Sequence, residues 1–184
     1  MRQCGDCQLC CKLLPVKSLG KLAGQRCQHQ RHHKGCAVYA QLKRVSPECK
    51  YWNCRWLVEN DTADLSRPDR SHYVIDLVPD FVTLRDDATG EAQHVEVVQI
   101  WVDPKYPDAH RDPALRAYLE RRAEQNIIGL VRWDNEQAMA IFPPALSEDG
   151  QWHEQGSNFH TKDHSVEEKI AALGPMVMHV VERT

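Results

Sequence analysis

CGDCQLCC, at residues 4–11, is the stretch that decides how the first third of this chain folds. Its cysteines stand two residues apart and then side by side, and four more cysteines follow before residue 55. The eight cysteines of the chain are Cys4, Cys7, Cys10, Cys11, Cys27, Cys36, Cys49 and Cys54. Because none occurs after Cys54, the chemistry that they share belongs to an N-terminal segment.

A spacing of two residues lets a tight turn bring two sulfur atoms onto one metal ion. The repeat Cys4, Cys7, Cys10 also resembles the runs that hold iron–sulfur clusters. If residues 4–11 are helical instead, Cys4, Cys7 and Cys11 share one face. Both geometries concentrate thiolates, and later cysteines return to close a four-sulfur site. We therefore predict that the eight cysteines are candidate metal ligands. They share two sites, or four of them form one site and the rest stay unligated.

A disulfide scaffold is the main alternative, because the number of cysteines is even. Disulfides belong to oxidising compartments, and the N-terminus shows no apolar stretch of signal-peptide length. No apolar run approaches the roughly 18 residues that a membrane helix requires. We therefore expect a cytoplasmic protein with reduced thiols and no membrane partner.

The charges divide where the cysteines end. Residues 1–54 carry ten Lys or Arg and two acidic residues, a net charge of +8, whereas the remainder carries 13 basic and 24 acidic residues, a net charge of −11. Thiolates around a metal leave net negative charge, and nearby cations lower thiol pKa values. The basic surplus thus indicates metal binding independently of the cysteine spacing.

Residues 1–54 contain too few large hydrophobic residues to form a core of their own. Small modules of this kind are stabilised by a metal or another cross-link. We predict a cysteine-cluster metal-binding module at residues 1–60, called the head below, and a body at residues 61–184. The connecting segment 55–70 is expected to pack through Trp56 and Leu65 rather than to form a flexible linker.

The body combines strand patterns with helix signals. Runs rich in β-branched and aromatic residues predict strands. These runs are 72–78, 81–85, 95–102, 127–133, 137–142 and 176–181. Asp112-Pro113 predicts the start of one helix, and the capping-box spacing of Ser165 and Glu168 predicts another that ends at Gly174-Pro175. The predicted fold class is α+β, with the head packed on a mainly antiparallel sheet with a few helices.

The cysteine pattern resembles that of a known family. CGDCQLCC at 4–11, Cys27, Cys36-Ala-Val-Tyr39, Cys49 and Cys54 are similar to the motifs of the YkgJ-like cysteine-cluster family, also described as a zinc- or iron-chelating domain with a CxxCxxCC motif. The resemblance covers about residues 1–60. An Arg-Pro pair that the family carries after the tyrosine is absent here, and Ser46-Pro47 precedes Cys49. The resemblance implies metal binding, and relatives linked to flagellin lysine methylation, which are associated with an iron–sulfur cluster, favour a 4Fe-4S cluster over zinc.

His29, His32 and His33 lie between two cysteines and are further candidate ligands, although a solvated basic loop is the simpler interpretation. Aromatic and basic residues then alternate, as in proteins that bind single-stranded nucleic acid. These residues are Tyr39, Lys43, Arg44, Lys50, Tyr51, Trp52, Arg55 and Trp56. Packing of the aromatics around a metal core is the competing interpretation, because no recognised nucleic-acid motif accompanies them.

Asp103, Asp108, His110 and Asp112 offer an acid/base or hard-metal site. Asp112 already serves as a predicted helix cap, however, and Asp-Pro pairs are ordinary turn formers. The later histidines are expected at the surface, and they are His153, His160 and His164.

The sequence therefore predicts a metal-binding protein that coordinates iron, as an iron–sulfur cluster, or Zn²⁺. One alternative is an iron–sulfur-dependent enzyme, methyltransferase-like or redox, whose body binds substrate. Another is a nucleic-acid or protein adaptor that uses the basic head. No Gly-rich phosphate loop, G-x-S-x-G or H-E-x-x-H motif occurs, so no catalytic residue is assigned.

Overall fold

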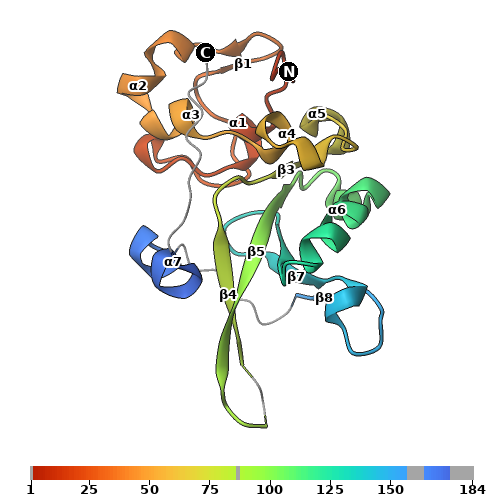
Figure 1. Ribbon diagram of the computed structural model, residues 1–184. Helices are drawn as coiled ribbons and strands as arrows, with labels where there is room; N and C mark the ends of the chain where they lie inside the picture. The colour runs from red at the N-terminus through yellow and green to blue at the C-terminus, as the bar shows by residue number, and fades with distance from the viewer. Residues whose placement is uncertain (1, 86–87, 157–163, 175–184) are drawn as a thin grey trace.

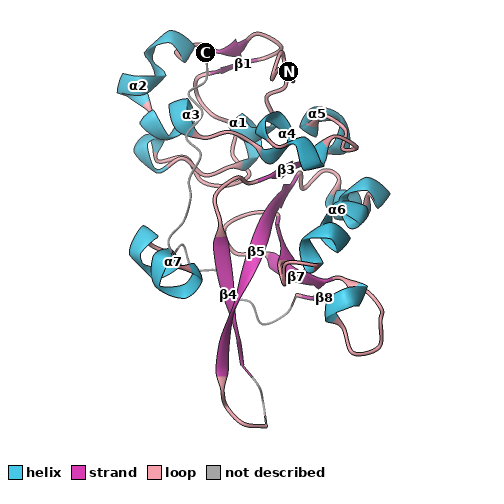
Figure 2. Ribbon diagram, in the orientation of Figure 1, coloured by secondary structure: helices cyan, strands magenta, loops and turns pink. Residues whose placement is uncertain are grey.

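The computed structural model describes residues 2–85, 88–156 and 164–174 (Figure 1). Short helices and loops of the N-terminal segment lie at one end of the molecule, and the longer strands lie at the other (Figure 2). Helices and a six-stranded sheet make up the fold, so the predicted α+β class is confirmed.

The head is built from short elements, in which η denotes a 3₁₀ helix. They are α1 (Leu9–Leu13), η1 (Lys17–Leu19), β1 (Gln30–Arg31), β2 (Gly35–Cys36), η2 (Tyr39–Gln41), α2 (Leu42–Val45), α3 (Pro47–Tyr51), α4 (Arg55–Val58) and η3 (Asn60–Thr62). The longest of these helices have five residues. Helices of this length are unstable alone in water, so their arrangement depends on what they pack against.

The body contains the longer elements. They are α5 (Pro68–Ser71), β3 (Tyr73–Ile75), β4 (Asp80–Arg85), β5 (Ala92–Val102), η4 (Pro107–Arg111), α6 (Pro113–Ala123), β6 (Ile128–Arg132), β7 (Ala138–Phe142), η5 (Pro144–Leu146), β8 (His153–Gln155) and α7 (Val166–Leu173). Four predicted strands are confirmed as β4, β5, β6 and β7. The strand predicted at 72–78 ends at Ile75, because the Asp76 carboxylate accepts a hydrogen bond from Val78 N and closes a turn. The strand predicted at 176–181 lies outside the described residues.

The sheet has the order β3-β5-β6-β7-β8, and β4 also pairs with β5. β5 is long enough to serve two partners, with Tyr73 opposite Val102 and Asp80 opposite Val97. β5 and β6, which α6 connects, are parallel, and the other pairs are antiparallel. The prediction of a mainly antiparallel sheet is thus confirmed.

Successive residues of a strand face opposite sides of the sheet, and this alternation separates two cores. Ile100 and Val102 of β5 pack with Leu119 of α6. Val74 of β3 and Trp101 of β5 pack instead with Leu9, Leu13 and Leu14 of the head. The head therefore covers the face of the sheet opposite α6.

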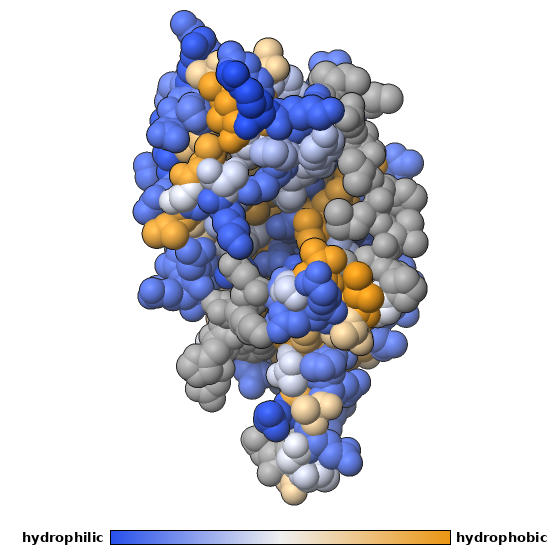
Figure 3. Space-filling view, turned by 90° about the vertical axis from the view of Figure 1, so that its left-hand side faces the viewer, coloured by the Kyte–Doolittle hydropathy of each residue, from blue (hydrophilic) through white to orange (hydrophobic). Residues whose placement is uncertain are grey.

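The two predicted helix starts are confirmed. Asp112 Oδ1 accepts a hydrogen bond from Ala114 N at 3.0 Å and so caps α6. Ser165 and Glu168 form both hydrogen bonds of the capping box of α7, which ends before Gly174. α7 lies against β4 and β5, and the surface is hollowed between α7 and the head (Figure 3).

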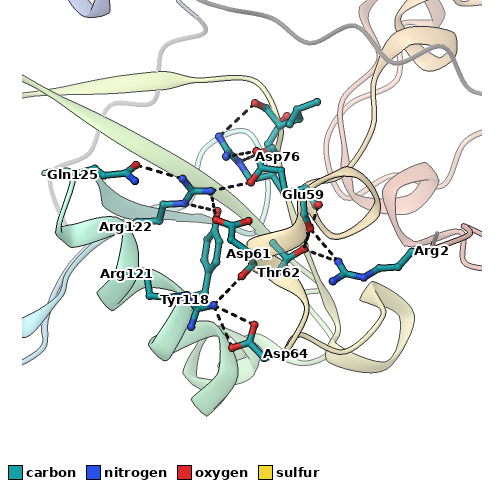
Figure 4. Close-up of polar contacts among 12 residues, drawn as sticks. Arg2, Glu59, Asp61, Thr62, Asp64, Asp76, Tyr118, Arg121, Arg122 and Gln125 are labelled. Carbon is teal, nitrogen blue, oxygen red and sulfur yellow. Dashed lines mark hydrogen bonds and ion pairs between the residues drawn. The ribbon is translucent and has the colours of Figure 1, made fainter.

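Ion pairs fasten the end of the head to α6 (Figure 4). Arg122 donates to Glu59 Oε2 at 2.8 Å and to Asp61 Oδ2 at 2.5 Å. Its Nε donates to Tyr118 Oη at 3.0 Å. Trp56 and Leu65 pack against the α6 core, so the connecting segment is ordered as predicted.

Candidate functional site

All eight cysteines are free thiols. Cys4 and Cys7 form a turn, in which Cys7 N donates to Cys4 O at 3.0 Å, whereas Cys10 and Cys11 lie in α1. The turn and the helix considered for residues 4–11 thus occur one after the other. The remaining four cysteines reach α1 from separate elements of the head.

Cys54 is the most buried cysteine, and it lies among N-terminal ones. Burial raises its pKa to about 12, and negative charge at Cys10, Cys4 and Cys7 adds to the rise. Burial also raises the pKa of Cys7 to about 11, again with a contribution from Cys10 and Cys4. Cys54 forms a backbone bridge to Asp76. This first group, Cys4, Cys7, Cys10 and Cys54, therefore lies where the head meets the sheet.

A second group surrounds Cys11, which interacts electrostatically with Cys27, Cys36 and Cys49. Cys27 N donates to Cys11 O at 2.9 Å, and Cys36 lies on β2, which pairs with β1 just after Cys27. A hydrogen bond from the Cys10 thiol lowers the pKa of Cys11, whereas burial raises the pKa of Cys49. The head thus gathers its thiols into two neighbouring groups, with Cys10 between them.

Among the residues that the structure describes, no three His, Cys, Asp or Glu side chains are arranged to hold a metal ion. The donor chemistry of the two groups nevertheless fits a soft metal or an iron–sulfur cluster, because thiolates are the preferred ligands of both. Mutual repulsion contributes to the raised pKa values of Cys7, Cys49 and Cys54. A bound cation would offset that repulsion.

Lys21 is a buried cation beside the second group, with 8% of its surface exposed. Burial lowers the pKa of its ammonium group, and negative charge at Cys27, Cys11 and Cys10 acts in the opposite direction. Its Nζ donates to the backbone carbonyl of Leu14. Of the surplus basic residues of the head, Lys21 thus lies where its charge can offset that of the thiolates.

A cavity of about 300 Å³ opens between the second group and the body (Figure 3). Two indoles, those of Trp52 and Trp101, form part of its lining. From the head, the thiol-bearing lining residues are Cys10, Cys11, Cys27 and Cys49. From the body, the polar lining residues are Asp76, Asp80, Gln99, Arg132, His164 and Lys169.

Asp80 is the centre of a hydrogen-bonded network in the body wall of the cavity. Its carboxylate accepts from Gln99 Nε2 at 2.7 Å and from His164 Nδ1 at 2.9 Å. Lys169 Nζ lies 3.4 Å from Asp80 Oδ2. Gln99 Oε1 in turn accepts from Arg132 at 3.1 Å. One buried polar cluster therefore joins side chains from β4, β5, β6 and α7. His164, just before the cap of α7, also belongs to it.

Asp76 is a second carboxyl group of the body that lines the cavity. Burial raises the pKa of its carboxyl group, and hydrogen bonds from Val78 N and from Trp52 Nε1, at 2.8 Å, favour its charged form. Arg55 is buried and donates to the backbone carbonyl of Asp76. Trp52 and Arg55 thus serve the interior, which agrees with the interpretation that these residues pack inward.

The other candidates from the sequence are spread over the molecule. His32 and His33 are exposed, which agrees with the interpretation as a solvated loop. Asp103 is buried and forms an ion pair with Lys12 at 2.5 Å, while Asp108 is exposed. Asp103 follows β5 and Asp108 lies in η4, and within the described residues the acidic stretch forms no metal-holding group.

His164 corrects one expectation. It was expected at the surface, but its side chain is only 17% exposed, stacks on Phe81 and lines the cavity. Its partner Asp80, distant in sequence, is what draws it inward. His153 is exposed as expected, and His160 lies outside the described residues.

The body wall of the cavity was missed from the sequence. Gln99 and Arg132 interrupt otherwise apolar strands, on the same face as Trp101 and Leu130. Strands buried on both faces rarely contain such residues without a reason. This break in the apolar pattern is the signal from which the wall could have been found.

No family model, curated protein or solved structure matched this chain. Within the described ranges, no helix is both long and apolar enough to cross a lipid bilayer.

Proposed function

We propose that this protein binds iron, as an iron–sulfur cluster, or zinc through the cysteines of its head. The observation that carries the proposal is the gathering of eight free thiols into two neighbouring groups. The resemblance of residues 1–60 to the YkgJ-like cysteine-cluster family supports it, and membership of that family is part of the proposal. So is a cytoplasmic location, where thiols stay reduced.

The proposed ligands are Cys4, Cys7, Cys10, Cys11, Cys27, Cys36, Cys49 and Cys54. A zinc ion would supply a structural cross-link there, and a 4Fe-4S cluster would supply electron transfer. The residues of the head hold the thiols near one another and place Lys21 beside them. Loading is expected to draw each group of side chains together, since no metal-holding arrangement exists among the described residues beforehand.

Anaerobic purification followed by elemental analysis and a visible absorption spectrum tests the proposal. Iron with acid-labile sulfide and a brown colour identifies a cluster, whereas zinc in a colourless protein identifies a structural site. Cys54→Ser and Cys49→Ser each remove one thiol from a different group. If there are two centres, each variant loses about half of the metal. Ser18→Ala is a matched control and should keep it all. A protein that stays metal-free after anaerobic reconstitution would overturn the proposal.

An iron–sulfur-dependent enzyme, methyltransferase-like or redox, is a second candidate. The cavity favours it, because four thiols and the polar wall of the body line the same space. A closed four-cysteine site argues against direct metal catalysis, since catalytic metals keep an open position. This candidate therefore requires an open fourth ligand position. Added small molecules should bind there and change the absorption spectrum.

A polyanion-binding adaptor is a third candidate, favoured by the surface of the head. Six exposed basic residues there take part in no ion pair with any residue that the structure describes. They are Lys17, Arg26, Arg31, Lys34, Lys43 and Arg44. Single-strand binding through six phosphate contacts predicts a slope of about −4.2 in a plot of log affinity against log salt concentration. Binding that is indifferent to salt removes this candidate.

A further inference from the structure

The cavity between head and body has a side that needs neither metal nor thiols to recognise a ligand. Its volume, about 300 Å³, is at the lower end of the range for small-molecule sites. Part of its lining is apolar: Leu14 and Val16 come from the head and Val78 from the body. The indoles of Trp52 and Trp101 add flat aromatic surface.

The acidic groups of the cavity already have hydrogen-bond donors. Asp76 accepts from Trp52 Nε1 and Val78 N. Glu48 accepts from Ser18 N at 2.9 Å. Asp80 accepts from Gln99 and His164 and forms an ion pair with Lys169. A ligand with a positive group would therefore compete with donors that are in place.

The basic end of the cavity has donor capacity to spare. Lys169 is nine-tenths buried, and its ammonium group, which has three N–H donors, forms an ion pair with Asp80 at 3.4 Å. His164 lies beside it on the same carboxylate. The guanidinium of Arg132 stacks over Trp101, with 4.4 Å from its central carbon to the ring centroid. Two basic side chains thus meet at one carboxylate, and a third, Arg132, is joined to it through Gln99 and lies on aromatic surface.

We propose that this cavity binds a small organic anion, with its carboxylate or similar group at Lys169 and His164 and its apolar part between Trp52 and Trp101. The network around Asp80 also fastens α7 to the sheet, and this structural role explains why the polar groups are buried. It does not explain why a space of this size is left open between them and the thiols. The site goes beyond the proposed metal binding, since its ligand contacts are made by side chains other than cysteine.

Phenylacetate is a suitable probe, and phenylacetamide, which has nearly the same shape and no charge, is its matched control. Titration would be followed by tryptophan fluorescence and by isothermal calorimetry, with the protein as purified and after metal removal. We expect saturable binding of phenylacetate and at least about tenfold weaker binding of phenylacetamide, because hydrogen bonds to charged groups are the stronger ones. Equal affinity for the two probes, or no saturable binding of either by the purified protein, overturns the proposal.

Two variants locate the site. Lys169→Met removes the charge but keeps the aliphatic chain, and it should reduce phenylacetate affinity to that of phenylacetamide. Val78→Phe fills the apolar part and should weaken both probes. Lys105→Met, at an exposed position outside the cavity lining, should change neither affinity.

Circular dichroism and thermal melting establish that each variant is folded before its affinity is compared. An undiminished preference for phenylacetate in folded Lys169→Met contradicts the proposal. If the protein binds phenylacetate but never takes up metal, the anion site is supported and the proposed metal binding is contradicted. The two proposals can therefore fail separately.

Discussion

Residues 1–60 and residues 61–184 differ in how much apolar surface they bury. Of the buried hydrophobic residues in the described part of the chain, seven lie in the head and twenty-two in the body. The head has nine short elements in this region, while the body has an eleven-residue helix and an eleven-residue strand. The body can be stabilised by its own core, whereas the head depends on the sheet beneath it and, by our proposal, on metal.

Metal removal is expected to have the largest effect on stability. It should also distinguish the head from the body most clearly. Structural zinc contributes on the order of 10 kcal/mol to the folding of small modules. Chelation under reducing conditions should therefore unfold the head and leave the body folded. Hydrogen exchange followed by mass spectrometry would show loss of protection at residues 4–54 and little change at 97–132. Equal protection of both parts before and after complete metal removal contradicts the prediction.

Shortening one buried leucine in each part is expected to have the next largest effect. Leu119 of α6 is fully buried and so close to β6 that a Cβ atom at Gly129 would lie 3.2 Å from it. Leu119→Ala should lower the free energy of unfolding by about 2–5 kcal/mol. Urea denaturation would measure this loss, and bound metal should be unchanged. Leu13→Ala is the matched change in the head, where it should lower metal retention instead.

Leu22→Ala serves as the control for both, because Leu22 is 53% exposed in the head. It should change stability by less than about 0.5 kcal/mol. If Leu13→Ala and Leu119→Ala lower the same single transition to the same extent, the two parts unfold as one unit, and the distinction drawn above is wrong.

The body was predictable from the sequence where local patterns suffice. Apolar alternation located β5, β6 and β7, and the side chains of Asp112 and Ser165 marked two helix starts. β8 was missed because its three residues are all exposed and polar, so it carries no apolar pattern. Its pairing with β7, rather than any preference of its own, makes it a strand.

The site was predictable only in part. Cysteine spacing identified the head, but it could not assign adjacent residues to different groups. Cys10 and Cys11 are hydrogen-bonded to each other, but they reach different cysteines because successive side chains of a helix point about 100° apart. The body wall requires Asp80, Gln99 and His164 to meet from distant positions, and no local pattern encodes such a meeting. Contacts between residues distant in sequence therefore determine the body wall of the cavity and the inward position of His164.

The contact between the two parts should yield a smaller effect. Arg122 is 14% exposed and joins Glu59 and Asp61 to α6 (Figure 4). Arg122→Met removes the ion pair of Asp61 and leaves Glu59 with Arg55 alone, and it should cost about 1–3 kcal/mol. Its neighbour Arg121 pairs with Asp64 at the surface, where both side chains are more than 40% exposed. Arg121→Met should cost less than about 1 kcal/mol. Equal losses from the two variants in thermal denaturation would show that burial of the pair is irrelevant.

The smallest effect concerns pH and separates the body from the thiols of the head. Burial lowers the pKa of His110, with Arg116 and Arg111 acting in the same direction, while Glu154 and a bond to the carbonyl of Pro107 oppose the shift. A histidine whose pKa is lower in the folded state binds fewer protons there than in the unfolded chain. Its contribution to stability is thus complete above the unfolded pKa, about 6.5, and is lost as the pH falls below that value.

His110→Gln should therefore narrow the stability difference between pH 7.5 and pH 5.5, measured by urea denaturation of metal-free protein so that thiol loading does not contribute. His153→Gln is the control, because His153 is exposed and its replacement should leave that difference almost unchanged. If His110→Gln leaves the full difference in place, the buried histidine of the body does not set its response to acid. The response would then have to come from other titratable groups of the protein.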